Sequence, residues 1–195
     1  MASVERIKLA QEIHDGIAQD LIGVGYSLDL MLASPEINST TRKELRTLRF
    51  TVSELIDKVR REMYQLRKPL GSTLSQELLA LNTNHRFAFD LETRCESKPL
   101  DIPLEYEYEI LRIAGELLQN IARHSGATSA TLSLAQNPDS LNLWVTDNGI
   151  GIETAEQSNF GLAGVRERAN TIHAEFTIES TDAGTFAHLR VPSTK

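Results

Sequence analysis

Two series of apolar residues at helical spacing dominate the first third of the sequence. They run over residues 7–31 and 45–66, in steps that mix three and four residues. Such steps form the seam along which one helix packs against another. Pro35 and the polar residues 38–40 interrupt the pattern between the two series. The pattern therefore predicts an antiparallel hairpin of two helices over residues 1–69, with arms of about 45 Å.

Each predicted helix has one apolar seam, and two helices cannot close a core that buries both seams. Pairing with a second copy into a dimeric four-helix bundle is the simplest way to bury them, and packing on the rest of the same chain is the alternative. We therefore expect a homodimer. His14 occupies the one slot that the first seam skips.

After residue 69 the pattern changes to a mixture of strands and helices. Three segments alternate apolar with polar or small residues, as strands of a sheet do. They are residues 87–91, 141–145 and 185–191. Residues 106–124 and 165–172 have the single apolar face of a helix. The predicted fold class is α+β, with the helical hairpin followed by an α/β-sandwich domain over residues 70–195.

Composition limits the possible functions. The chain has 195 residues, of which 41% are hydrophobic, enough for one large or two small domains. It has no apolar run near the roughly 18 residues that span a bilayer and no signal peptide pattern, so we expect a cytoplasmic protein without membrane contact. The single cysteine, Cys95, excludes an intramolecular disulfide. The net charge of −7 argues against direct binding of nucleic acid.

The first candidate chemistry lies within the first predicted helix. His14 is followed directly by Asp15, and Gln19 comes one helical turn after Asp15. An imidazole beside a carboxylate can accept a phosphoryl group and pass its proton to the acid, and the amide can hold a water near the same spot. A lone histidine on a helix is more often a packing or surface residue, so the pattern alone leaves both interpretations open.

A second group of polar residues falls on one face of the predicted helix 106–124. Glu116, Asn120 and His124 recur every four residues, and Arg123 lies beside them. An amide oxygen is a ligand suited to Mg²⁺, while arginine and histidine can donate to phosphate oxygens. A solvated helix face would have the same composition.

A third group surrounds the end of the predicted strand 141–145. Asp147 follows this strand and is succeeded by Gly149 and Gly151. An acid at a strand end can accept a hydrogen bond from an exocyclic amine such as that of adenine, and glycines let backbone approach a ligand. Asp-Asn-Gly is also an ordinary turn signal.

A fourth group consists of glycines that we expect to precede the helix 165–172. Gly161, Leu162 and Gly164 would place backbone amides at the helix start, where phosphate binds well. The polar run 153–158 before them can form a mobile lid. Thr185 opens the last predicted strand after a glycine.

The order of these motifs resembles the catalytic core of a sensor histidine kinase. The resemblance is to the subfamily of the nitrate and membrane-fluidity sensors, and it covers nearly the whole chain. The matching segments are residues 12–19, 116–125, 147–151, 161–169 and 184–185. Such a resemblance implies a Bergerat-type ATP-binding domain of the kind shared with gyrase and Hsp90, and ATP and Mg²⁺ as cofactors.

The resemblance also implies a role for each matching residue. His14 would be the phosphorylated histidine, Asp15 the group that takes or orients its proton, and Gln19 the residue that positions water in the reverse reaction. Glu116 would belong to the catalytic residues, and Asn120 would hold Mg²⁺. Ten residues would contact the nucleotide: Asn120, Arg123, His124, Asp147, Gly149, Gly151, Gly161, Leu162, Gly164 and Thr185.

The implied function is a two-component kinase. It would phosphorylate His14 from Mg-ATP, pass the phosphoryl group to an aspartate of a response regulator receiver domain with a helix-turn-helix output, and act as a phosphatase of that regulator. The chain would be the cytosolic part of a larger, membrane-bound sensor. The alternatives are an ATPase or serine kinase of the same superfamily, in which Glu116 activates water or a hydroxyl, and a degenerate nucleotide-binding scaffold.

Some positions depart from the family pattern. Asn159 stands where the family usually has another glycine, and His173-Ala174 replaces a frequent glycine pair. His85 and His188 match no motif, so we interpret them, with Trp144, as structural or surface residues.

Overall fold

The computed structural model describes the chain except for residues 1, 70, 85–86, 97–101, 152–158 and 194–195. The predicted lid, residues 153–158, and His85 therefore lie outside the described residues. The chain divides into two compact units, Met1–Gly71 and Ser72–Lys195. The sequence pattern places the division after residue 69. We call the two parts the helical unit and the α/β unit.

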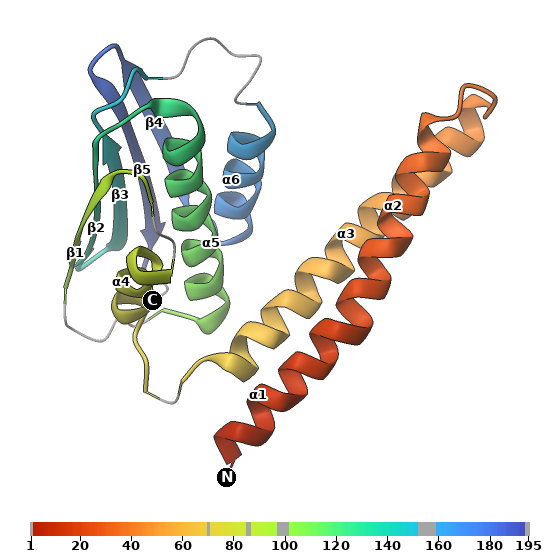
Figure 1. Ribbon diagram of the computed structural model, residues 1–195, viewed down its shortest axis with the longest axis horizontal. Coiled ribbons are helices and arrows are strands. Elements are labelled where there is room, and N and C mark those ends of the chain that lie inside the picture. Colours follow the sequence, from red (N-terminus) through yellow and green to blue (C-terminus); the bar gives the residue numbers. More distant parts are fainter. Residues whose placement is uncertain (1, 70, 85–86, 97–101, 152–158, 194–195) are drawn as a thin grey trace. The chain divides into compact units, whose positions relative to one another are not determined.

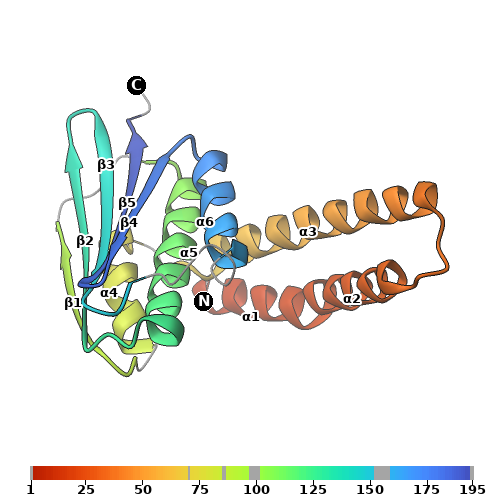
Figure 2. The same cartoon turned by 90° about the horizontal axis from the view of Figure 1, so that it is seen from above.

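The helical unit is a hairpin of two long arms (Figures 1 and 2). The first arm consists of α1 (Ala2–Ile13), a π-helical turn η1 (His14–Ala18) and α2 (Gln19–Ala33). The second arm is α3 (Ser39–Arg67), which packs against all three segments. None of the described helices has both the length and the apolar content needed to cross a bilayer.

Polar contacts fix the antiparallel pairing of the two arms. Near one end, Arg6 Nη2 donates to the Gln65 carbonyl at 2.7 Å. Further along, Arg49 Nε pairs with Asp29 Oδ1 at 2.9 Å. Asn38 caps α3, because its side-chain oxygen accepts a hydrogen bond from the backbone N–H three residues later. The early part of one arm thus lies beside the late part of the other.

The π turn changes which residues of the first arm face α3. A π turn holds about one residue more than an α turn, so it shifts the helical register of everything after it. Ala10 is fully buried, and the next buried apolar residue is Ala18 rather than the predicted Ile17. In α2, Gly25 is buried instead of the predicted Val24. Of the predicted seam, Ala10 and Leu28 therefore face the hairpin interior, whereas Ile17 and Val24 lie outside it.

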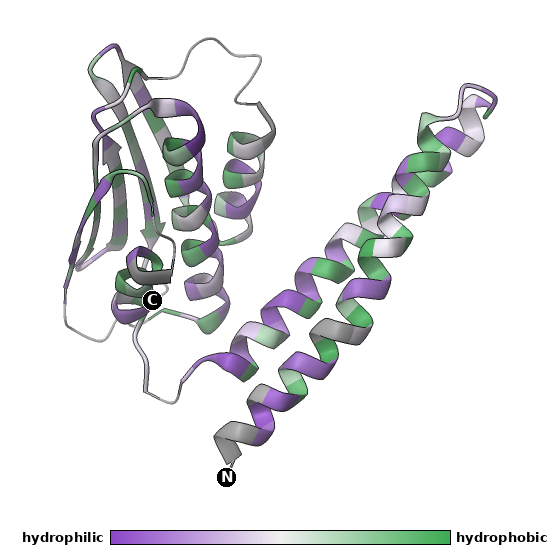
Figure 3. Cartoon of the chain, viewed as in Figure 1, coloured by the Kyte–Doolittle hydropathy of each residue, from purple (hydrophilic) through white to green (hydrophobic). Residues whose placement is uncertain are grey.

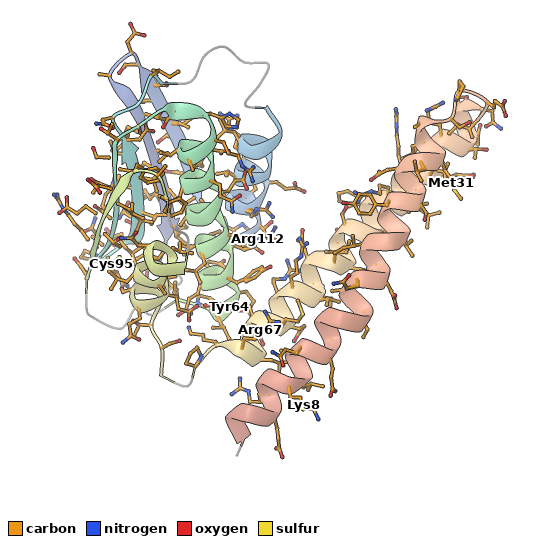
Figure 4. All side chains as sticks on the ribbon, viewed as in Figure 1. Lys8, Met31, Tyr64, Arg67, Cys95 and Arg112 are labelled. Atoms are coloured by element: carbon orange, nitrogen blue, oxygen red, sulfur yellow. The ribbon has the colours of Figure 1, made fainter. Side chains whose placement is uncertain are left out.

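Several predicted seam residues remain at the surface of the single chain as a result. Ile17, Val24 and Met31 are 55%, 48% and 54% exposed. On α3, Leu48 and Leu55 are 53% and 44% exposed. Hydrophobic and hydrophilic residues alternate along both arms (Figure 3), and Met31 lies in the upper part of the first arm (Figure 4). The hairpin interior alone does not bury both apolar stripes.

The α/β unit is a single five-stranded sheet with helices on one face (Figures 1 and 2). Its helices are α4 (Leu74–Asn84), α5 (Leu104–Asn120), the π turn η2 (Ile121–Ser125) and α6 (Asn159–Thr171). Its strands are β1 (Asp90–Cys95), β2 (Ser129–Asn137), β3 (Ser140–Asp147), β4 (Glu175–Thr181) and β5 (Gly184–Pro192). The strand order is β1-β2-β3-β5-β4, parallel between β1 and β2 and antiparallel elsewhere.

Alternation of apolar residues along the strands builds the core. Leu132 and Leu134 of β2 and Leu143 of β3 are buried, and so are Ile110 and Ile113 on α5. Because successive side chains of a strand point to opposite faces, every second residue reaches the helices. This core fixes α5 and α6 over one face of the sheet.

The predicted helical hairpin and α/β domain are confirmed as a fold class, with differences in detail. β2, β4 and α4 were not predicted. The strand predicted from residue 87 begins at Asp90, where pairing with β2 starts, and the Phe87 and Phe89 rings before it stack with centroids 4.9 Å apart. The helix predicted from residue 165 begins at Asn159. Gly161 and Gly164 thus lie inside α6 rather than before it.

The end of α6 explains one departure from the family pattern. The Ala174 N–H donates to the Ala169 carbonyl at 2.8 Å, and the His173 N–H donates to the Asn170 carbonyl at 3.1 Å. These bonds form a Schellman motif, whose residue after the helix end is left-handed. His173 occupies that position with φ 52°, where glycine is usual.

Candidate active site

A cavity of about 320 Å³ opens in the α/β unit, where the end of α5, the start of α6, the end of β3 and the start of β5 meet. This volume is at the lower end of the range of ligand pockets. Nine of the predicted site residues line it: Glu116, Asn120, Arg123, His124, Asp147, Gly151, Gly161, Leu162 and Thr185. Residues that are far apart in the sequence of the α/β unit therefore line one cavity.

Asp147 is the buried acid of this cavity. It ends β3 and is only 6% exposed. Its Oδ1 accepts a hydrogen bond from the Gly149 N–H at 2.8 Å, and among the described residues no partner is seen for its second oxygen. Because Asp147 lines the cavity, this second oxygen is an acceptor that remains available to a donor. Asp147 can therefore accept a hydrogen bond from a ligand.

The turn after Asp147 requires glycine at two positions. A Cβ on Gly149 would lie 2.4 Å from the Ser125 carbonyl oxygen. Gly151 has φ 76°, and a Cβ there would lie 2.4 Å from the Thr181 carbonyl oxygen. Gly149 does not line the cavity, and its part is to hold Asp147 through its amide.

Glu116 and Asn120 lie one turn apart on α5, facing the first turn of α6. A Cβ on Gly161 would lie 2.8 Å from Glu116 Oε1 and 3.3 Å from Asn120 Oδ1. Glycine here lets α6 approach these two polar groups without displacing the Glu116 carboxylate. Gly161 thus matters for close packing of two helices.

The polar end of α5 continues through η2. The π turn carries Arg123 and His124, which are exposed at the cavity mouth. Arg123 Nη2 donates to Gln119 Oε1 at 3.2 Å. The spacing of four residues from Asn120 to His124 was interpreted as a regular helix, yet both residues reach the cavity across the change to π geometry.

Gly164 does not line this cavity, and His14, Asp15 and Gln19 belong to the helical unit. A Cβ on Gly164 would meet the Arg168 guanidinium at 3.2 Å, so this glycine makes room for Arg168. His14 and Asp15 open the π turn η1, and Gln19 is the exposed first residue of α2. The side chains of His14 and Asp15 lie outside the described part of the structure.

Sequence reasoning missed the apolar wall of the cavity. Val145, Ala187 and Ile178 lie side by side across β3, β5 and β4 and all line it. Val145 is two residues before Asp147 and so faces the same side. The partners on β5 and β4 became evident only from the strand pairing, since nothing in their own sequence marks them.

Comparisons with known proteins agree with this arrangement. Residues 5–71 match the family model described as histidine kinase, and residues 106–195 match the model described as histidine kinase-, DNA gyrase B-, and HSP90-like ATPase. These two matches contain the hairpin and most of the α/β unit.

Curated relatives include three sensor proteins. The sensor histidine kinase MctS of Rhizobium johnstonii is 28% identical over 96% of this chain and 43% of its own length. The sensor protein VraS of Staphylococcus epidermidis is 29% identical over 98% and 56%. The nitrate/nitrite sensor protein NarX of Escherichia coli is 29% identical over 92% and 31%. The chain thus spans about half or less of the length of these relatives.

Solved structures show the same fold. The histidine kinase domain of a blue-light activated histidine kinase from Erythrobacter litoralis has a TM-score of 0.52 and 20% identity, and covers 86% of this chain and 95% of its own. The histidine kinase AdeS of Acinetobacter baumannii has a TM-score of 0.53 and 14% identity, over 93% and 98%.

The fold and the cavity define the α/β unit as an ATPase domain of the type that histidine kinases share with gyrase B and Hsp90. With the histidine kinase match over the hairpin, the chain belongs to the sensor histidine kinases and comprises the two domains of their catalytic core.

Proposed function

We propose that the chain is the kinase core of a two-component system, which phosphorylates His14 from Mg-ATP bound in the cavity. The observation that carries this proposal is the buried Asp147, with one oxygen fixed by the Gly149 amide and the other without a described partner. Such an acid suits the exocyclic amine of adenine. The apolar wall of Val145, Ala187 and Ile178 suits the flat purine beside it.

The same cavity has groups suited to a metal-bound triphosphate. Asn120 offers an amide oxygen, and Arg123 and His124 offer donors for phosphate at the cavity mouth. Among the described residues no cluster of three acidic, histidine or cysteine ligands exists, which fits Mg²⁺ held by few protein ligands together with phosphate oxygens. Because Gly161 has no side chain, the Asn120 amide is not covered. Mg²⁺ there would neutralise charge on the phosphates.

The phosphoryl transfer needs positioning more than covalent help from the protein. An imidazole nitrogen of His14 attacks the γ-phosphorus, the bond to the β,γ-bridging oxygen breaks, and ADP leaves. Asp15 takes or orients the imidazole proton. In the second step an aspartate of a response regulator receiver domain attacks the phosphorus, and the nitrogen–phosphorus bond breaks.

The reverse activity would use Gln19. This residue begins α2 immediately after the π turn that holds His14, and it is exposed. Its carboxamide can hold a water in line with the aspartyl phosphate of a regulator. We therefore include phosphatase activity toward the regulator in the proposal.

The core would act as a homodimer through the helical unit. The exposed seam residues Ile17, Val24 and Met31 of the first arm, with Leu48 and Leu55 of α3, are apolar surface that a second copy would cover. In the whole protein, this core would be the cytosolic part of a larger membrane-bound sensor, which agrees with the share of its relatives that the chain spans.

The test is incubation with γ-labelled ATP and Mg²⁺, followed by acid and alkali treatment of the protein. A histidine kinase gives a label that is labile in acid and stable in alkali, and His14→Gln removes it. An ATPase releases labelled phosphate without labelling the protein, a serine kinase gives an acid-stable label, and a scaffold gives neither. Any of these three results contradicts the proposal.

A further inference from the structure

Two residues hold the turn of residues 147–151 from opposite sides. On one side, the Ser125 carbonyl accepts a hydrogen bond from the Ile150 N–H at 2.9 Å. On the other, Asn148 Oδ1 accepts from the N–H groups of Thr128 and Ser129, each at 3.0 Å. Ser125 lines the cavity and Asn148 does not, and neither was given a role in the function proposed above.

Ser125 is itself fixed in place. It is 5% exposed, its Oγ donates to the Ile121 carbonyl at 2.9 Å, and the same Oγ accepts from the Ala127 N–H at 3.0 Å. It ends η2, so it ties the turn to the helix that carries Asn120. Because Gly149 has no room for a Cβ beside Ser125, a shift of Ser125 would move the Gly149 amide.

Asn148 fixes the turn to the start of β2. Besides the two accepted bonds, its Nδ2 donates to Thr128 Oγ1 at 2.9 Å, and its own N–H donates to the Ser129 carbonyl at 3.2 Å. The Asn148 side chain makes these hydrogen bonds at the surface, where it remains exposed. The position of the residue directly after Asp147 is thus set by the neighbouring strand.

The orientation of the Asp147 carboxylate depends on both contacts. Its only described partner is the Gly149 N–H, which lies between the Asn148 and Ser125 attachments. Without the hydrogen bond from the Gly149 N–H, the Asp147 carboxylate could rotate. Its second oxygen would then no longer be held toward one point of the cavity. We propose that Ser125 and Asn148 are positioning residues that aim the free oxygen of Asp147 at the base, and so set the selectivity for a 6-amino purine. This inference rests on the proposed nucleotide-binding function.

The selectivity between adenine and hypoxanthine nucleotides distinguishes a positioning role of these two residues from a general contribution to the stability of the fold. A carboxylate attracts the amine of adenine and repels the carbonyl oxygen that hypoxanthine has at the same place. A site built to hydrogen-bond one group discriminates strongly against an analogue without it, because the site's own polar group is left unpaired. Looser packing alone would weaken both nucleotides equally, whereas a misdirected Asp147 would lower their affinity ratio.

The experiment is calorimetry of ADP and inosine diphosphate binding, which needs no turnover. The variants are Asn148→Ala and Ser125→Ala, with Asn148→Asp as the conservative replacement that keeps the two accepted bonds. Asn82→Ala is the matched control, since exposed Asn82 also bridges to a neighbouring strand, by donating to the Leu91 carbonyl at 3.0 Å, and does not line the cavity.

We expect wild type to prefer ADP, and the ratio of the two affinities to fall by roughly five- to tenfold in Asn148→Ala and Ser125→Ala. Asn148→Asp and Asn82→Ala should keep the wild-type ratio. Thermal unfolding of each variant reports whether it folds, and if Ser125→Ala does not, the Asn148 pair decides.

An unchanged ratio in Asn148→Ala, with ADP binding in wild type, overturns this inference and leaves the proposed function intact. Equal losses for both nucleotides also overturn it. A wild-type chain that binds no ADP overturns the proposed function and the inference together.

Discussion

At the scale of single residues, the environment of Asp147 is the observation that most narrows the range of possible functions. It is nearly buried and lines the cavity, and its one described side-chain hydrogen bond leaves an oxygen to which a ligand can donate. The same residue would be unremarkable at an exposed turn. Its burial cannot be read from the sequence. That burial favours a ligand-binding acid over an ordinary turn as the interpretation of Asp-Asn-Gly.

Asp147→Asn and Asn120→Asp should both abolish autophosphorylation, by different routes. The first variant replaces the acceptor that meets the base, so the affinity for ATP itself should fall by about tenfold or more. The second alters the metal ligand, so ATP should still bind while its Mg²⁺ dependence changes. Calorimetry with and without Mg²⁺ measures the difference. Wild-type affinity for ATP in Asp147→Asn would contradict the assignment of this residue to the base.

Asp15 and Gln19 should serve opposite directions of phosphoryl flow. Asp15→Asn should suppress autophosphorylation while ATP still binds, because the imidazole proton loses its acceptor. Gln19→Ala should keep autokinase activity and lose most phosphatase activity, because the in-line water is no longer held. Both rates are measured with labelled His14 and with a phosphorylated regulator. Dephosphorylation at the wild-type rate by Gln19→Ala would rule out this division of labour.

Sequence alone identified the polar residues of the cavity but not how the chain holds them. Asp147 and Asn120 were found because their motifs stand in the order that the family resemblance implies. Ser125 was not, because it acts through a backbone carbonyl that its hydroxyl fixes by bonds to other backbone groups. A backbone hydrogen bond between two segments depends on how the folded segments pack, and residue types alone do not reveal that packing.

At the scale of elements, the end of α6 stores a small strain. His173 adopts a left-handed conformation in the Schellman motif, which costs a residue with a Cβ more than it costs glycine. His173→Gly should therefore raise the free energy of unfolding of the α/β unit by about 0.5 to 1 kcal/mol. Urea unfolding measures it. Glu167→Gly, at an exposed position inside α6, should lower stability by a similar amount, and a gain there would show that the reason is wrong.

The pairing of β3 with β5 brings a histidine onto the sole tryptophan. The His188 and Trp144 rings stack with centroids 5.3 Å apart, and His188 Nε2 lies 3.0 Å from Asn142 Oδ1. Burial lowers the pKa of His188 below its ordinary value, Arg190 lowers it further, and Glu175 partly opposes them. In the pH range between the lowered pKa and the ordinary one, the unfolded chain binds more protons than the folded one.

Stability should therefore fall as pH drops from about 7 through the ordinary histidine pKa of roughly 6.5. His188→Gln, which can still donate to Asn142, should reduce this dependence. Urea unfolding at several pH values, followed by Trp144 fluorescence, measures the effect. An identical pH profile for both proteins would mean that His188 does not contribute.

Elements with strong periodicity were predictable, and others were not. The two arms of the hairpin and the α5 helix have long apolar repeats, and β3 and β5 have clean alternation. β4, Glu175–Thr181, has an exposed face and short polar residues, so its strand form depends on pairing with β5. The early start of α6 was missed because glycines usually mark helix ends, whereas here close packing against Glu116 explains Gly161.

At the scale of the whole molecule, the order of motifs along the chain identified the family, and both the family and the fold class are confirmed. Each motif by itself had an ordinary structural explanation. Their joint appearance in one order is much rarer than any single pattern. The assignments of individual site residues stay predictions, which the experiments above address.

Dimerisation should depend on the exposed seam. Val24 is 48% exposed in the single chain, so Val24→Glu leaves the hairpin interior intact but puts an unpaired charge into the proposed interface. Light scattering should show a dimer for wild type and a shift toward monomer for this variant, since a buried unpaired charge costs several kcal/mol. Tyr26→Glu, at a position 69% exposed on another face of α2, should remain a dimer. A wild-type monomer at micromolar concentration would exclude the interface.

The π turn at His14–Ala18 also bears on how much length variation the helical unit tolerates. Ala18 and Gly25 are seven residues apart, as a heptad requires, but Ala10 precedes Ala18 by eight. The wide turn absorbs that one extra residue. A related chain shorter by one residue here could therefore run as an uninterrupted α-helix and still place both flanks against α3. Homologous arms of unequal length can thus share one packing register.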